Sequence, residues 1–197
     1  LLRSMKRAGA HTLFIGFESV NPNSLAEMKK GQALEEMRTS IETIHRHGLH
    51  IHGMFVFGFD SDDCQTSDAT VRFIREMKLT SAQLLILTPL PGSALHKQLL
   101  AQGRITSSDW SLYDAHHVVF RPANLSPMEL QRAQIHGHTR LYSPLHTLQK
   151  IVTGRFLSAG LSAYAWRINR QWQRDNRAYM DWLRGLPQSH ERAVWRH

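Results

Sequence analysis

The sequence predicts an α/β protein built around a parallel sheet. Three runs, at residues 11–18, 50–59 and 82–88, are too continuously apolar to be strands with one solvated face. A stretch with helical periodicity follows each run. Strands and helices that alternate in this way indicate right-handed βαβ units. The pattern alone is compatible with an open doubly wound sheet and with a barrel.

The helices between these strands are marked by capping residues and by the spacing of apolar residues. After a turn at Pro22, Ser24 is expected to cap a short helix. A longer helix with one apolar face follows and ends at Gly48. Two more helices are predicted at residues 66–77 and 94–102.

The pattern changes after Gly103. Residues 104–125 are rich in turn-forming and aromatic residues, so we expect a covering loop there. Ser126 and the proline after it predict the start of a helix that runs to about Leu141. Further helical patterns fill residues 144–153 and 160–185. The predicted organisation therefore has three parts: βα units at residues 1–103, the covering loop at residues 104–125 and a helical extension at residues 126–197.

The composition narrows the class of protein. With 42% hydrophobic and 20% charged residues, the chain has the balance of a globular protein. It contains no apolar run near the roughly 18 residues that a membrane span requires and no secretory signal, so we expect a cytoplasmic protein. The single cysteine, Cys64, excludes an internal disulfide and a four-thiolate metal site built by this chain alone. Because the sequence opens at Leu1 with what resembles the end of a helix, we expect a fragment of a longer protein.

The net charge of +8 is concentrated toward the C-terminus. After Gly154 there are eight arginines against Asp175, Asp181 and Glu191. A basic tail can meet nucleic acid, anionic lipid or an acidic partner, but a solvated helix face is the simpler interpretation, and nucleic acid is not an expected partner. Three tryptophans lie among these arginines and are expected to pack against protein: Trp166, Trp172 and Trp182.

Other reactive side chains carry weaker signals. Cys64 is expected to be an ordinary thiol, and His116 and His117 to be surface or turn residues. No metal site is expected, although four histidines surround the start of the second strand: His45, His47, His50 and His52.

The residues at the strand ends are the candidates for chemistry. Ligands of βα folds bind at the carboxyl ends of parallel strands, which here are residues 16–19, 57–62 and 87–93. A glycine at such an end allows a flat ligand to lie against the main chain, whose amide and carbonyl groups can then read a base edge. Glu18 can accept hydrogen bonds from hydroxyl or ammonium groups.

The order of these motifs is more specific than any one of them. The succession GFES, MKKG, GMFVFGFDSD and LTPLPGS resembles the second half of the radical S-adenosylmethionine (SAM) barrel, in particular the class with an N-terminal cobalamin-binding domain. The run DWSLYDAHHVVFRP and the segment SPMELQ resemble the region after that barrel in the same class. The resemblance implies a partial (β/α) TIM-type barrel, three βα units of a radical SAM core, followed by a mostly helical C-terminal extension.

The resemblance also implies a set of SAM contacts. Glu18 matches the polar position that faces the ribose or methionine part of SAM, and Lys30 falls where relatives often carry an arginine that meets the SAM carboxylate. Gly58 belongs to the strand that packs against adenine, whereas Met54 stands where some relatives have an aspartate. The SAM-binding residues implied in this way are Glu18, Ser19, Lys30, Val56, Phe57, Gly58, Leu87, Thr88 and Pro89.

The implied activity needs more than this sequence supplies. The family's three-cysteine loop, which binds a [4Fe–4S] cluster, has no counterpart among these residues, so no catalytic residue is assigned and the chain alone is expected to be inactive. Together with the missing N-terminal half of the barrel and a cobalamin domain, it is expected to serve radical chemistry. Cobalamin-dependent methyl transfer or a rearrangement on a lipid-like small molecule or secondary metabolite fits the resemblance best.

Two alternatives remain open at this point. A radical SAM tRNA methylthiotransferase shares the middle motifs and would use a basic tail, although the C-terminal region lacks the short strands of a small RNA-binding barrel. The second alternative is a noncatalytic remnant or binding module.

Overall fold

The structure is a computed structural model, which describes residues 1–28, 31 and 33–186. Its three strands are β1 (Thr12–Glu18), β2 (His50–Phe57) and β3 (Ser81–Ile86). The helices before and between them are α1 (Leu2–Arg7), α2 (Pro22–Glu27), α3 (Leu34–Arg46) and α4 (Thr66–Glu76). After β3 follow α5 (Ala94–Ala101), a 3-10 turn at Trp110–Leu112, α6 (Pro127–Leu141), α7 (Pro144–Val152), α8 (Phe156–Asp175) and α9 (Arg177–Gly185).

The three strands form one parallel sheet in the order β1-β2-β3. This confirms the predicted α/β class and the three predicted strands, each within two residues of its expected limits. Three parallel strands occur both in an open sheet and in part of a barrel, so the partial barrel stays a prediction. No helix among the described residues is both long enough and apolar enough to cross a bilayer.

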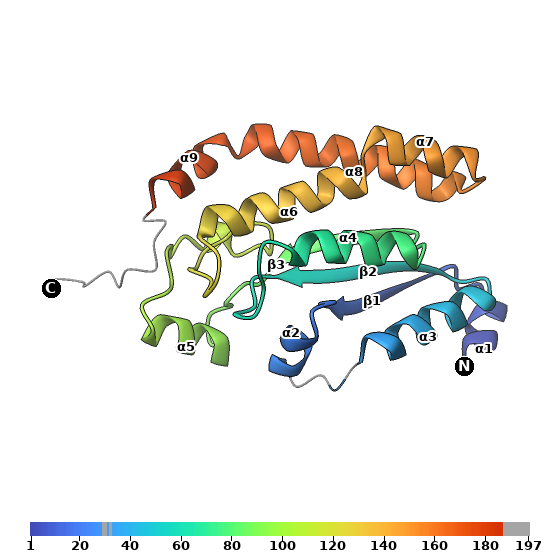
Figure 1. The fold of residues 1–197 in the computed structure, drawn as a ribbon, viewed down its shortest axis with the longest axis horizontal. Coiled ribbons are helices and arrows are strands. Elements are labelled where there is room, and N and C mark those ends of the chain that lie inside the picture. The colour runs from blue at the N-terminus through green and yellow to red at the C-terminus, as the bar shows by residue number, and fades with distance from the viewer. Residues whose placement is uncertain (29–30, 32, 187–197) are drawn as a thin grey trace, which may run out of the picture.

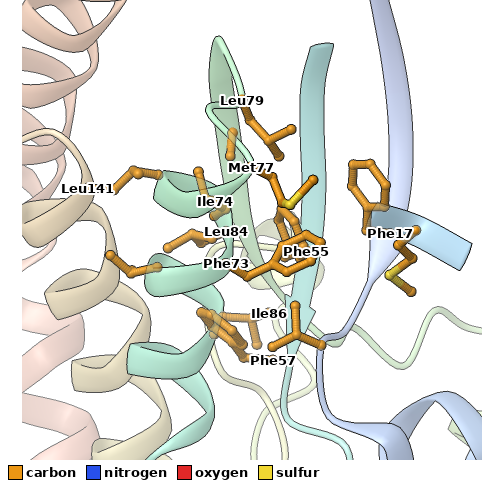
Figure 2. Close-up of a cluster of buried hydrophobic side chains, with 14 of the residues drawn as sticks. Phe17, Phe55, Phe57, Phe73, Ile74, Met77, Leu79, Leu84, Ile86 and Leu141 are labelled. Atoms are coloured by element: carbon orange, nitrogen blue, oxygen red, sulfur yellow. The ribbon is translucent and has the colours of Figure 1, made fainter. Parts of the chain in front are cut away.

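One face of the sheet carries the main core. Phe17 of β1 stacks on Phe55 of β2 with 5.4 Å between ring centroids, and both meet Phe73 of α4 edge-on (Figure 2). Leu84 and Ile86 of β3 are buried in the same cluster. The helices α3 and α4 add their apolar faces, so this side of the sheet is sealed from solvent.

The outer edge of β3 is covered by helix α6 and does not pair with a further strand among the described residues. Side chains of α6 and of Tyr142, the residue after it, form hydrogen bonds with the β3 main chain. The Tyr142 hydroxyl accepts from the Ala82 amide at 2.8 Å and donates to the Ala82 carbonyl. Gln134 and His138 both contact the Leu84 carbonyl oxygen, at 3.0 and 3.1 Å. Residues 134, 138 and 142 follow one another at four-residue spacing, so a single helical face satisfies an edge that would otherwise be unpaired.

The remaining helices form an outer layer. In Figure 1, α6 lies between the sheet and the pair α7 and α8. The Ser158 hydroxyl of α8 donates to the Thr80 carbonyl at 2.6 Å, which ties this layer to the start of β3. The core contains Leu125, Leu130 and Leu141 together with the strand residues, so the predicted helical extension and the βα units share one hydrophobic core.

One local prediction is wrong. Asn21, not Ser24, caps α2: its side chain accepts from the Asn23 amide, while Ser24 lies inside the helix and donates to Asp62 at 2.7 Å. The helical pattern expected over residues 160–185 is confirmed as two helices, α8 and α9, which are separated by a break at Asn176. The Asn176 side chain is held by His117 and by the Trp172 carbonyl, and these two bonds stabilise the kink.

Candidate functional site

The second face of the sheet is open and forms the candidate site. Its side chains make rows across the strands: Phe14 beside His52 and Ser81, then Gly16 beside Met54 and Gln83, then Val56 beside Leu85. Unlike the fully buried residues of the opposite face, the side chains in these rows are half-buried or exposed, and Phe14 is 71% exposed. A face of this kind is available for a ligand.

At the end of β1 the main chain departs from a regular strand. Register with β2 shifts between Gly16 and Glu18, and Glu18 has a φ of 65°, which is unusual for a residue with a side chain. A Cβ atom at Gly16 would lie 2.6 Å from the Glu18 Oε1 atom, so the carboxylate folds back over Gly16. The bulge thus places a carboxylate above the open face, in space that only a glycine leaves free.

Ser19, next to Glu18, is buried and serves the turn. Its hydroxyl accepts from the Asn21 amide at 3.0 Å. Its amide donates to the Phe17 carbonyl at 2.9 Å. These bonds hold the main chain of the β1 end in place.

At the end of β2, Gly58 is fixed by its surroundings. Its φ is 112°, and a Cβ atom there would lie 3.0 Å from both Leu130 and Phe120. Its amide donates to the buried carboxylate of Asp62 at 2.8 Å, as does the Phe59 amide at 3.1 Å. The Gly58 amide is therefore already bonded within the chain, to Asp62. Burial raises the pKa of Asp62 despite these hydrogen bonds.

The ends of β2 and β3 lie side by side. The Leu87 amide donates to the Phe57 carbonyl at 2.8 Å, and Phe57 itself is buried on the helix-covered face. The Thr88 hydroxyl donates to the Ile86 carbonyl at 3.0 Å, and Pro89 is buried beyond it. Leu87 and Thr88 are half-buried, so this end contributes side chains as well as main chain to the edge.

Hydrogen bonds join the loops that follow the strands. The Asn21 side chain donates to the Ser61 carbonyl at 3.0 Å, which links the loop after β1 to the loop after β2. Arg104 forms a two-point ion pair with Asp60, at 2.9 and 2.5 Å. Asn124 donates to the Asp60 carbonyl at 2.7 Å. The carboxyl edge of the sheet is therefore a connected structure, as a binding edge requires.

A cavity of about 520 Å³ opens on the other half of the same face. The sheet contributes Phe14, His52 and Gln83, and α8 lies opposite. The wall on the α8 side is mostly apolar and aromatic: Leu161, Tyr164, Ala165, Ile168 and Trp172. Polar groups from α6 and its surroundings complete the lining: His116, Gln134, His138 and Tyr142. An apolar cavity with a few convergent polar groups is typical of a small-molecule site.

His138 in the cavity wall makes the fold sensitive to acid. Burial lowers its pKa to about 4, and the neutral ring holds the Leu84 carbonyl at 3.1 Å. Since the unfolded ring titrates near 6.5, stability is fully present above that pH and is lost as the pH falls toward 4. We expect the free energy of unfolding to fall by about 1–3 kcal/mol between pH 7 and pH 4.5, measured by urea denaturation. In the variant His138→Gln, whose amide can still donate to Leu84, this part of the pH dependence should disappear.

The structure thus places most of the predicted residues at the carboxyl edge of the sheet, but only some of their side chains reach the surface. Glu18, Val56 and Leu87 are half-buried, Thr88 joins them, and Ser19, Phe57, Gly58 and Pro89 are buried. Lys30 lies outside the described residues. Gln83, His138 and Tyr142 were not predicted as site residues. Gln83 lies in a strand whose pattern indicates only an apolar run, and the signals used for the helix that carries His138 and leads to Tyr142 were its capping residues. The four-residue spacing of His138 and Tyr142 was the available signal.

Cys64 lies in the loop between β2 and α4, whereas His52 and Trp172 line the cavity. Among the residues with described positions, no group of histidine, cysteine, aspartate or glutamate side chains is arranged to hold a metal ion, and Cys64 is exposed. A [4Fe–4S] cluster therefore finds no ligand set in that part of the chain. His117 is bonded to Asp114 at 2.9 Å and to Asn176 at 2.8 Å, and Trp172 packs on its ring. Its role in this contact is to join the covering loop to α8 and α9.

Comparison with known proteins yields methyltransferases. The chain is 34% identical over 125 residues to the bacteriochlorophyllide d C-12(1)-methyltransferase of Chlorobaculum tepidum. The matched residues make up 63% of this chain and 27% of that protein. It is 26% identical over 144 residues to the bacteriochlorophyllide d C-8(2)-methyltransferase of the same organism, covering 72% and 32%. It is 26% identical over 110 residues to the hopanoid C-2 methylase of Rhodopseudomonas palustris, covering 55% and 21%.

The matched relatives share one class of reaction, methyl transfer. The chain spans only between a fifth and a third of the length of these curated relatives. No protein-family model matches it. The relatives are methyltransferases, in agreement with the radical SAM methyl transfer that the sequence motifs imply.

Proposed function

We propose that this chain is part of a radical SAM methyltransferase and that the open face of its sheet binds SAM beside a small, largely apolar substrate. The observation that carries the proposal is the Glu18 carboxylate, folded over Gly16 at the carboxyl edge of a parallel sheet. A carboxylate in that place accepts hydrogen bonds from the hydroxyl or ammonium groups of a ligand on the sheet. The similarity to methyltransferases supports SAM as that ligand.

In this proposal, residues at different strand ends bind different parts of SAM. Glu18 receives the ribose hydroxyls or the ammonium group, and Lys30 meets the SAM carboxylate. Val56 and Leu87 give the adenine ring an apolar surface, and both are half-buried rather than fully covered. Because the Gly58 amide is bonded to Asp62, the role of Gly58 is to shape the strand end. Ser19, Phe57, Thr88 and Pro89 support the same edge.

The cavity on the same face supports an apolar substrate. Its aromatic and aliphatic wall along α8 suits a flat or polycyclic molecule, and His52, Gln83 and His138 can orient polar substituents. Gln83 belongs both to the cavity and to the row of Gly16 and Met54, so the cavity borders the region assigned to SAM. Relatives named for bacteriochlorophyllide and hopanoid methylation favour a substrate of this size and polarity.

The reactive cofactor chemistry belongs to a longer protein in this proposal. In the longer protein, a [4Fe–4S] cluster would supply the electron for reductive cleavage of SAM. The described residues provide no ligands for the cluster, so no step of that chemistry is assigned to them. Cobalamin as methyl carrier is likewise a proposal for the longer protein. We therefore expect the present chain to bind SAM without cleaving it.

The test is SAM binding by the 197-residue chain, measured by isothermal titration calorimetry. The variant Glu18→Gln removes the charge and keeps the shape, and it is expected to weaken SAM binding at least about tenfold, because hydrogen bonds to charged groups are worth about 1.5–3 kcal/mol. A matched control is Glu35→Gln, since the Glu35 side chain is 87% exposed on α3. This control should bind SAM as the parent does.

Three outcomes would contradict the proposal in different ways. A folded chain that gives no heat with millimolar SAM supports a noncatalytic remnant or binding module. Equal SAM affinity in the parent and in Glu18→Gln removes Glu18 from the site. Salt-sensitive binding of tRNA by the chain would favour the methylthiotransferase alternative.

A further inference from the structure

The hairpin formed by α7 and α8 is built with its polar side inward. The two helices follow one another through the turn at residues 153–155 and pack together. The buried polar side chains of the hairpin are Lys150, Ser158 and Ser162, which are 4%, 3% and 0% exposed. The Lys150 ammonium donates to the Ser162 hydroxyl at 2.6 Å and lies 5.7 Å from the centre of the Tyr142 ring. A charged group in this position is the reverse of the usual arrangement, in which the apolar face of a surface helix is buried.

The opposite side of the same hairpin exposes large apolar side chains. Leu145, Leu148 and Val152 share one side of α7, because they are three and seven residues apart. They are 69%, 55% and 79% exposed. Three more complete what we call the hairpin patch, at the end of α7 and the start of α8: Ile151, Phe156 and Leu157. Six neighbouring side chains of this size are more than the scattered apolar residues of an ordinary surface, so the patch indicates contact with another apolar phase.

The α7–α8 hairpin carries positive charge. Between Glu129 and Asp175 the sequence has no acidic residue. Of the basic residues in this stretch, Lys150 is buried and Arg140 is paired with Asp68. On the hairpin this leaves Arg155, next to Phe156 of the patch, and three exposed arginines farther along α8: Arg167, Arg170 and Arg174. Neighbouring α4 contributes two acids, Asp68 and Glu76, and each is paired with an arginine. The hairpin that carries the patch is therefore positively charged, with Arg155 next to the patch itself.

The combination of aliphatic side chains and positive charge decides between possible partners. Nucleic acid would use the arginines but has no need of exposed leucine, isoleucine and valine, since such interfaces are polar. A second copy would bring two basic surfaces together. An anionic lipid surface uses both properties, because aliphatic groups enter the boundary of the acyl chains while arginines meet the headgroups.

We propose that the α7–α8 hairpin docks on an anionic lipid surface through the hairpin patch. The hairpin lies on the bilayer and does not cross it. Figure 1 shows α7 and α8 as the outer layer of the molecule, on the side of α6 away from the sheet. Docking through α7 therefore does not place this helix over the open face of the sheet. The inference is independent of the function proposed for the sheet.

The test is co-sedimentation of the 197-residue chain with extruded vesicles. Vesicles of equal parts phosphatidylglycerol and phosphatidylcholine are compared with pure phosphatidylcholine at low salt and at about 0.5 M salt. We expect at least about tenfold stronger partitioning into the anionic vesicles, and loss of most of that difference at high salt, because screened headgroups no longer attract the arginines. The triple variant Leu148→Ser/Val152→Ser/Phe156→Ser is expected to reduce partitioning at least about tenfold, because aliphatic burial supplies part of the binding.

A matched control has equally exposed leucines elsewhere. Leu90 and Leu100 are 55% and 59% exposed, and they lie beyond β3 and in α5. The variant Leu90→Ser/Leu100→Ser should bind vesicles as the parent does, and circular dichroism should show that both variants are folded. The proposal is overturned if the parent does not sediment with anionic vesicles, or if the triple variant binds as well as the parent. Dimerisation that the triple variant abolishes, without vesicle binding, would assign the patch to a second copy.

Discussion

Replacing Tyr142 by phenylalanine is expected to lower the free energy of unfolding by about 2–4 kcal/mol, although it removes a single oxygen atom. The Tyr142 hydroxyl satisfies both the amide and the carbonyl of Ala82 at the edge of β3, and the side chain is buried. Burial raises its pKa to about 12, so the group is protonated and can donate at any physiological pH. Phenylalanine fills the same space but leaves two buried main-chain groups without a partner, each worth about 1–3 kcal/mol.

The measurement is equilibrium unfolding in urea, followed by circular dichroism at neutral pH. A matched control is Tyr164→Phe, since Tyr164 is 65% exposed and the change there should stay within about 0.5 kcal/mol. If Tyr142→Phe unfolds at the same urea concentration as the parent, water reaches the β3 edge and α6 does not seal it.

The second large effect is expected at the end of β2. Gly58→Ala should destabilise the protein by about 2–4 kcal/mol, for two reasons that add. The φ of 112° is unfavourable for any residue with a Cβ atom, and that atom would lie 3.0 Å from Leu130 and Phe120. Those neighbours are 1% and 0% exposed, so the core around them has little room to move.

Two other glycines separate the causes. Gly92 has a φ of 84°, but nothing lies within 4 Å of the position that a Cβ atom would take, so Gly92→Ala measures the main-chain cost alone and should be milder. Gly160 lies inside α8 with open space around it, so Gly160→Ala should stabilise the protein by about 0.5–1 kcal/mol. A Gly58→Ala variant no less stable than Gly92→Ala would show that the core yields to the added methyl group.

The sequence was informative where one physical signal dominates. The strand positions followed from continuous apolar runs, and helix α6 followed from Ser126, whose side chain accepts from the Glu129 amide as a capping box predicts. The kink at Asn176 was not predictable in this way, because its cause is a bond to His117, 59 residues earlier. Long-range contacts of this kind override local periodicity.

The candidate site was predictable in its position but not in its details. The rule that ligands bind at strand ends located Glu18, Gly58 and Leu87 correctly at one edge of the sheet. That the Glu18 carboxylate folds over Gly16 depends on a bulge, and that the Gly58 amide is taken by Asp62 depends on a loop conformation. Neither leaves a signature in residue spacing. The cavity beneath α8 depends on how separate helices pack, which no local pattern encodes.

The side-chain seal along β3 also determines how this sheet can grow. Hydrogen-bonding groups at Ala82 and Leu84 are already occupied by α6, so an incoming strand finds no template there. In the part of the chain that the structure describes, β1 pairs with β2 on one side only. Any further strand, whether from the same polypeptide or from a misassembled neighbour, must therefore enter alongside β1. The sheet can therefore extend in one direction only: its β3 edge is closed by α6, and its β1 edge can accept a further strand.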